Sequence, residues 1–284
     1  MDCNIINCML FANINIEPQG ENLMKLSSEE LEQKKLKPQT LDLAIQQVRA
    51  NGYVVFGSVL EKNLVDTLRS CLMELLSKYT AKTDSNRGKN RYQMHLPFSR
   101  PFTNPQIITN PIALLVIDAI IGSDCICHYL ASDTPLPKSE YQHVHSDIHR
   151  LFPSRETTPP YSVSMNIPLV DFTRENGAME IWPGGTHLMP NGIDMSQLSK
   201  TMHSELVLMP AGSLLIRDMR MWHRGTPNRS NAARPNMAFI FSRYWFKTSY
   251  PPIGISQETY KSLSDRAKQL FRHEQIGDRS DPRF

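Results

Sequence analysis

The amino-acid sequence predicts an α+β fold, mainly β, in which helices support a β-sandwich of the jelly-roll type. In the first half of the chain, clear helical patterns lie between residues 40 and 122, before the histidine-rich segment. After Gly122, short runs of strand-forming residues alternate with Pro, Gly, Asn and Asp, which is typical of antiparallel sandwiches. The 284 residues, 40% hydrophobic and 21% charged, are also enough for a large core.

The changes of composition along the chain predict one domain after a short extension. Residues 1–38 are polar and irregular, and we expect a variable N-terminal extension there. We expect residues 39–284 to form a single domain. It divides into helical support (40–122), a jelly-roll core (123–247), and a C-terminal tail with a helix (248–284).

The first elements follow from capping residues and apolar spacing. A helix is predicted from its N-cap at Thr40 to Gly52, followed by the buried strand Tyr53–Phe56. A second helix carries an apolar stripe from Leu64 to Tyr79. Asn110 as N-cap, Pro111 behind it and Gly122 at the end bracket a third helix.

The polar segment 80–91 between the second and third helices carries Lys82, Arg87, Lys89 and Arg91. A loop that faces water is one interpretation. The other is a lip that contacts anions, since Gln93, His95 and Arg100 follow directly.

The second half of the chain predicts seven strands. They cover residues 125–131, 141–148, 161–170, 178–182, 205–209, 213–217 and 236–246. The long polar stretch 188–201 is predicted to be a loop, long enough to act as a lid. A helix capped by Ser256 is expected from residue 257 to about residue 272.

Charge, hydropathy and cysteine content exclude several classes of protein. A net charge of +3 without a basic stripe argues against a nucleic-acid partner. No window reaches the roughly 20 apolar residues of a membrane span, and the first sixteen residues lack the features of a secretion signal. The odd number of cysteines without paired spacing favours reduced thiols and a cytoplasmic protein. The sequence leaves the oligomeric state open.

The strongest chemical signal is the segment 141–152, in which three histidines and one aspartate occupy seven consecutive positions. Residues i and i+2 of a strand share one face, so His145 and Asp147 can bind one divalent metal ion. His143 has the same parity. The segment can therefore also be written His-x-His-x-Asp-x-His, which suggests a metallo-β-lactamase-like zinc hydrolase. That motif needs the last histidine directly after the aspartate, and here Ile148 intervenes.

A third metal ligand must come from elsewhere in the chain. Of the remaining histidines, His223 follows a predicted strand and a tight turn that can aim it into the mouth of a sandwich. Two histidines and one carboxylate are the ligands of non-haem Fe(II) oxygenases. Such a site needs an oxoacid, and Arg234, at the head of a strand, can bind its distal carboxylate, unless it is a surface arginine.

The ordered set of these motifs resembles the phytanoyl-CoA dioxygenase family of Fe(II)/2-oxoglutarate oxygenases. The set comprises Gln142-x-x-His145-x-Asp147, residues 171–177, the Pro-Gly-Gly-Thr-His turn that ends at His187, Trp222-His223, and Arg234 eleven residues later. The resemblance implies a double-stranded β-helix, with iron held by His145, Asp147 and His223 and 2-oxoglutarate held by Arg234. It also implies cosubstrate contacts from Gln142, Asn166 and Thr226.

The resemblance implies oxidation of a small-molecule C–H bond with O2, with release of succinate and CO2. Related halogenases lack the carboxylate that Asp147 supplies, so hydroxylation is favoured, and a secondary metabolite is the expected substrate. The candidate substrate contacts are Arg100, Arg150, Phe152, Trp182 and Arg224, together with Arg155. The alternatives are the zinc hydrolase and a cupin-like metal-binding protein without enzymatic activity.

Overall fold

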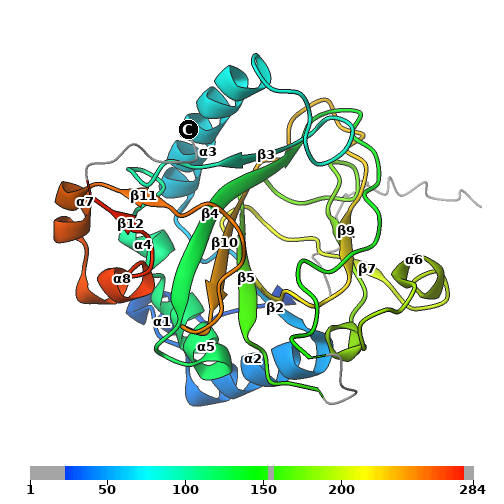
Figure 1. Cartoon of the computed structure of the whole chain (residues 1–284), viewed down its shortest axis with the longest axis horizontal. Coiled ribbons are helices and arrows are strands. Elements are labelled where there is room, and N and C mark those ends of the chain that lie inside the picture. The colour runs from blue at the N-terminus through cyan, green and yellow to red at the C-terminus, as the bar shows by residue number, and fades with distance from the viewer. Residues whose placement is uncertain (1–22, 153–156, 278–284) are drawn as a thin grey trace, which may run out of the picture.

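The computed structural model describes residues 23–152 and 157–277, and its strands form one large sheet and two smaller ones. The chain is therefore a mixed α/β structure with a seven-stranded sheet at its centre (Figure 1). The strands of this sheet are, in spatial order, β1 (Leu23–Met24), β2 (Tyr53–Phe56), β8 (Leu214–Asp218), β5 (Ser162–Pro168), β10 (Asn236–Ser242), β4 (Ile126–Pro135) and β3 (Arg91–His95).

The two faces of the large sheet differ in chemistry because side chains alternate along each strand. On β10, Met237, Phe239 and Phe241 belong to the main hydrophobic core. The alternate residues Ala238 and Ile240 instead line a cavity. Ala238 pairs with Asn166 of β5 in antiparallel register. The register thus separates an apolar face that supports the fold from a more polar face that is available for a site.

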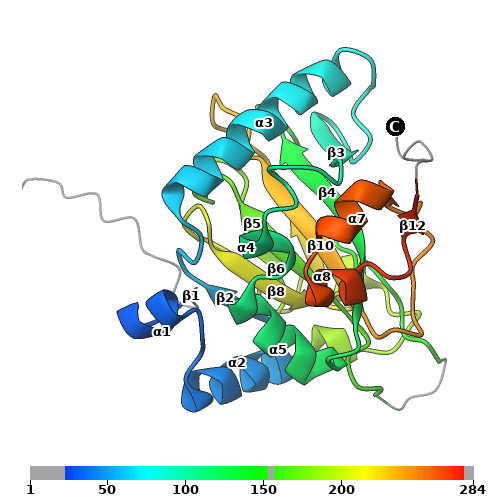
Figure 2. The same cartoon turned by 90° about the vertical axis from the view of Figure 1, so that its left-hand side faces the viewer.

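Helices cover the apolar face (Figure 2). Asn110 caps one of them, α5, by accepting a hydrogen bond from the backbone N–H of Ala113, and Gly122 (φ 96°) ends it, as predicted. The helices are α1 (Ser28–Gln33), α2 (Pro38–Asn51), α3 (Lys62–Thr80), α4 (Pro105–Ile108), α5 (Pro111–Ile121), α6 (Met195–Leu198), α7 (Gln257–Ser262) and α8 (Asp265–Leu270), with the 3-10 helix η1 (Thr186–Leu188).

A three-stranded antiparallel sheet lies on the other side of the large sheet (Figure 1). It consists of β7 (Glu205–Leu206), β6 (Met179–Ile181) and β9 (His223–Gly225). A two-stranded sheet, β11 (Gly254–Ile255) with β12 (Gln275–Ile276), lies near the C-terminal helices. The small sheet brings β9 close to the cavity face of the large one.

The predicted strand 141–148 is wrong. In the structure this segment makes one isolated bridge, between His145 and His223. Its backbone N–H groups at Gln142 and His145 donate to carbonyl groups of β9, but no regular ladder forms. Its polar side chains leave it without an apolar face to bury, so it follows β9 as an extended loop.

Several boundaries also differ from the predictions. The first predicted helix, α2, begins at Pro38 rather than behind Thr40, because proline is well suited to the first helical position. The C-terminal helix is two helices, since Leu263 is extended (ψ 150°) and Ser264 caps α8. Residues 23–33 are not irregular: they form β1 and α1, with a capping box between Ser27 and Glu30.

Candidate metal centre

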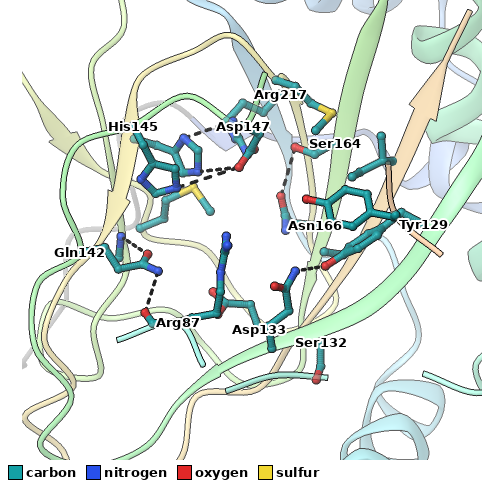
Figure 3. Close-up of a pocket in the computed structure, with 18 of the residues that line it drawn as sticks. Arg87, Tyr129, Ser132, Asp133, Gln142, His145, Asp147, Ser164, Asn166 and Arg217 are labelled. Atoms are coloured by element: carbon teal, nitrogen blue, oxygen red, sulfur yellow. Dashed lines mark hydrogen bonds and ion pairs between the residues drawn. The ribbon is translucent and has the colours of Figure 1, made fainter. Parts of the chain in front are cut away.

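His145, Asp147 and His223 lie together at the cavity face. One donor atom from each lies within 4.8 Å of the others, and no other such group of metal-binding side chains occurs among the described residues. Asp147 Oδ1 is 3.6 Å from His223 Nε2 and 4.0 Å from His145 Nε2. Figure 3 shows His145 and Asp147 side by side at the cavity wall. The three predicted ligands are therefore brought together.

Backbone hydrogen bonds hold these ligands in place. The N–H of His145 donates to the carbonyl of His223 at 3.0 Å, and the reverse bond measures 2.9 Å. The N–H of Asp147 donates to the carbonyl of Met219, also at 2.9 Å. The extended loop that carries two ligands is thus tied to the strand that carries the third.

The tautomers of both histidines follow from backbone acceptors. Nδ1 of His145 lies 2.8 Å from the carbonyl oxygen of His143, and Nδ1 of His223 lies 3.1 Å from that of Met221. A carbonyl only accepts, so Nδ1 of His145 carries the ring proton. Nδ1 of His223 also lies 3.3 Å from Arg217 Nη1, which only donates, but the carbonyl is nearer, and we assign the proton to this Nδ1 as well. Both Nε2 lone pairs are then free to bind a metal ion.

Arg217, on β8, contacts the carboxylate oxygen that points away from the histidines. Its Nη2 donates to Asp147 Oδ2 at 2.5 Å, and its side chain is only 3% exposed. Burial works against ionisation of Asp147, but Arg217 and the two histidines hold its pKa well below the usual range. Burial and the charge of Arg217 lower the pKa of His223 to about 3. The site therefore offers one carboxylate and neutral imidazole, the form that a divalent ion needs.

Two imidazoles and one carboxylate oxygen fit Fe(II) with open positions for further ligands. His143 and His149 are exposed and are not members of this group. The pattern His-x-His-x-Asp-x-His consequently does not assemble into one site among the described residues.

Arg234 places a guanidinium group at the wall of the same cavity. The residue is 2% exposed, and its guanidinium carbon lies 4.0 Å from the centre of the Phe172 ring. Burial lowers its pKa to about 10, against the opposing charge of Asp133, so it remains a cation at neutral pH. A buried cation beside the metal ligands is suited to a dicarboxylate.

The other predicted cosubstrate residues lie in different surroundings. Asn166 lines the cavity. Gln142 also lines it, but both ends of its amide bind backbone groups: Oε1 accepts from Gly225 N–H and Nε2 donates to the carbonyl of Arg87 (Figure 3). Thr226 is not part of the wall, since its hydroxyl donates to the carbonyl of Ala178.

None of the predicted substrate residues that the structure describes lines this cavity. Arg100 and Phe152 are exposed, while Arg150 is buried. Trp182 donates its indole N–H to the carbonyl of Ser199. Arg224 forms an ion pair with Glu180. Arg155 lies outside the described residues.

The cavity wall also includes residues that were not predicted to lie at the metal centre. Tyr129 and Arg217 belonged to predicted strands, and the parity of those strands was the available signal. Arg87 and Gln93 belonged to the predicted anion-contacting lip. The remaining members of the wall are Ser132, Asp133, Ser164, Met179, Met219, Gly225, Ala238, Ile240 and Tyr250.

Within residues 23–152 and 157–277, no helix is both long and apolar enough to cross a membrane.

Comparisons with known proteins point to one family. A family model described as "Phytanoyl-CoA dioxygenase (PhyH)" matches residues 48–236. The "Dioxygenase trt7" of Aspergillus terreus (strain NIH 2624 / FGSC A1156) is 22% identical over 238 residues, which are 80% of this chain and 82% of that protein.

Two solved structures show a similar fold. EvdMO1 matches with a TM-score of 0.59 and 22% identity over 72% of this chain, which spans only 50% of EvdMO1. The epimerase SnoN, in complex with Fe3+, alpha ketoglutarate and nogalamycin RO, matches with a TM-score of 0.58 and 18% identity over 72% of this chain and 84% of its own.

Proposed function

Since the chain belongs to the phytanoyl-CoA dioxygenase family, we propose that it hydroxylates a C–H bond of a small molecule, most simply a secondary metabolite. It is an enzyme of the non-haem type that depends on Fe(II), 2-oxoglutarate and O2. The hydroxyl oxygen would come from O2, and 2-oxoglutarate would leave as succinate and CO2. Family membership supports the cofactors, whereas the reaction and the substrate class are the proposed part.

One observation carries this proposal. Three side chains each direct one metal-binding atom to the same point, while the other polar atom of each side chain already has a hydrogen-bond partner. The Nδ1–H groups of His145 and His223 donate to backbone carbonyls, and Asp147 Oδ2 accepts from Arg217. The three converging atoms are therefore left for Fe(II). We assign His145, Asp147 and His223 as its ligands.

The other residues of the site would bind and orient the cosubstrate. Arg234 would hold the distal carboxylate of 2-oxoglutarate through its planar fork. Asn166 would contribute a polar amide, while Gln142 would keep β9 and the segment 86–91 in place through its two backbone contacts. When bound, iron and 2-oxoglutarate together supply the activation of O2. Contacts by Thr226 are not supported by its position.

Hydroxylation is the simplest outcome because Asp147 supplies the carboxylate ligand that related halogenases lack. The relatives carry different names, a dioxygenase and an epimerase, so the family admits several outcomes. A small molecule is supported by the complex of SnoN with nogalamycin RO, which is a property of that protein. An organic substrate would approach through the same cavity.

The proposal extends to the fold and the compartment. We propose that the two sheets form a double-stranded β-helix, supported by the His145–His223 bridge between the loop and β9. Residues 39–284 would form one domain, supported by a core that joins helices of both chain halves to the large sheet. The free thiols of Cys71, Cys125 and Cys127 support a reducing, cytoplasmic compartment.

Anaerobic titration with Fe(II) and 2-oxoglutarate tests the assignment. The wild type is expected to develop a weak visible charge-transfer band. His223→Ala is expected to lose it, and Arg234→Met to require much more 2-oxoglutarate. His149→Ala, which removes an exposed neighbouring imidazole, serves as the matched control and should keep the band. An unchanged band in His223→Ala would refute the ligand assignment.

A further inference from the structure

A set of hydrogen-bond donors lines the cavity in addition to the proposed iron ligands and Arg234. Arg87 comes from the segment between α3 and β3, Tyr129 from β4, and Tyr250 from the segment after β10. The rings of the two tyrosines lie 4.5 Å apart, centre to centre. Segments far apart in the sequence thus place three donors on one cavity.

Arg87 is held at the cavity by its neighbours. The side chain of Asn86 exchanges two hydrogen bonds of 2.8 Å with the backbone of Gln93. The carbonyl of Arg87 accepts from Gln142 at 3.2 Å. Among the described residues its guanidinium has no hydrogen-bond or ion-pair partner. Lys89, two residues later, instead pairs with Glu140 at 2.6 Å.

The two tyrosine hydroxyls are donors as well. Tyr129 accepts a hydrogen bond from Gln93 Nε2, which leaves its own O–H free to donate. The hydroxyl of Tyr250 has no hydrogen-bond partner among the described residues. Burial raises the pKa of both phenols, so both keep their protons at neutral pH. The positive charge of Arg87 lowers the pKa of both phenols, so Arg87 lies within electrostatic reach of each tyrosine.

No described carboxylate forms an ion pair with Arg87, although Asp133 lies on the same wall and acts on the pKa of Tyr129 with the opposite sign. Arg217 is paired with Asp147, and Arg234 would be paired with the distal carboxylate of 2-oxoglutarate. The proximal carboxylate of 2-oxoglutarate would balance part of the metal charge. Arg87 is exposed, so water solvates part of its guanidinium, and a carboxylate in the cavity would add a charge-assisted bidentate pair.

We propose that Arg87, Tyr129 and Tyr250 bind a carboxylate, or an equivalent anionic oxygen group, of the substrate. Met179, Met219 and Ile240, on the same wall, would contact its apolar part. The substrate is then an organic acid with an apolar body. This inference rests on the proposed function, because it assumes that iron and 2-oxoglutarate occupy the other charged groups of the site.

A matched pair of probes tests this anion site. The protein is loaded with Zn(II), a diamagnetic substitute for iron, and saturating 2-oxoglutarate. Binding of 4-fluorophenylacetate and of its uncharged isostere 4-fluorophenylacetamide is then followed by fluorine NMR line broadening. The acid is expected to bind more tightly than the amide. Arg87→Met should weaken the acid about tenfold and leave the amide unchanged, and Tyr250→Phe should weaken the acid by about threefold.

Lys89→Met is the control, since it removes a neighbouring cation whose partner is Glu140. It should leave the affinity for the acid unchanged. The anion site is refuted if acid and amide bind equally, if the acid does not bind, or if Lys89→Met weakens it as much as Arg87→Met. If Zn(II) and 2-oxoglutarate themselves fail to bind the wild type, the proposed function fails instead.

Discussion

Asp147 presents its two oxygens to different partners. Oδ1 faces the two Nε2 atoms, and Oδ2 accepts from Arg217 at 2.5 Å. Arg217 would therefore be a positioning residue: it occupies one oxygen and leaves the other directed at the place of the proposed metal ion. The charge of Arg217 would also repel a divalent metal ion. Its contribution to metal binding must therefore come from orienting Asp147 and from keeping the ligands deprotonated.

Arg217→Met is expected to make metal binding more sensitive to acid. Burial is the larger influence on Asp147 and His223, but the charge of Arg217 lowers the pKa of both. Without it both pKa values rise, so protons compete with the metal ion at higher pH. The ratio of the Zn(II) dissociation constants at pH 5.5 and pH 7.5 should increase by about threefold to tenfold.

Competition with a chromophoric chelator at the two pH values measures this ratio. Arg217→Lys keeps the charge and should restore most of the wild-type ratio. An unchanged ratio in Arg217→Met would mean that Arg217 only fills space.

At the scale of elements, the site depends on how an irregular segment is fixed. Residues 141–148 carry two of the three proposed ligands but form no strand, and β9 holds this segment through backbone hydrogen bonds. Gly225 of β9 allows a close approach, since a Cβ there would meet Arg91 Nη1 at 2.5 Å and Gln142 Oε1 at 2.7 Å. Helices on the opposite face, α5 among them, keep the large sheet in shape.

Asn110→Ala is expected to destabilise the fold without changing the site. Its side chain accepts from Ala113 N–H at 3.0 Å and so satisfies the first turn of α5. Losing such a cap costs about 1 kcal/mol, which lowers the melting temperature by roughly 2–4 °C in a chain of this size. Thermal unfolding followed by circular dichroism measures the change.

Asn110→Ser keeps a capping oxygen and should recover most of the loss. The affinity for 2-oxoglutarate should be the same in all three proteins. A loss of that affinity in Asn110→Ala would show that α5 influences the site directly.

At the scale of the whole molecule, a bound metal ion would join separate parts of the structure. Its ligands come from the extended loop and from the small sheet, while Arg234 lies at the head of β10 in the large sheet. A ligand that binds only the folded state raises its stability through mass action. Metal and cosubstrate together should therefore stabilise the arrangement of the two sheets.

Fe(II) with 2-oxoglutarate under argon is expected to raise the melting temperature. Ligand at a hundredfold excess over its dissociation constant contributes about 2.7 kcal/mol, equivalent to roughly 5–10 °C. A chelator should reverse the shift, as differential scanning fluorimetry can show. His145→Gln should melt at the same temperature with and without ligands, and a full shift in this variant would contradict the assignment of His145.

The sequence alone determined the family, the residue types at the candidate site and the local elements around it. Metal-binding residue types, capping residues and apolar spacing are local properties. The residues that converge at the cavity, His145, Asp147 and His223, and the limits of α5 could therefore be predicted. The comparisons bear out the family and its cofactors.

Tertiary structure decided which other side chains reach the cavity. Strand pairing joins residues far apart in the sequence, and no local pattern encodes it. It placed Arg217 beside Asp147 and Arg87 near Tyr250, while Arg224 turned to Glu180. The residue types therefore indicated the family and its cofactors, whereas the packing of the two sheets selected the groups that line the cavity.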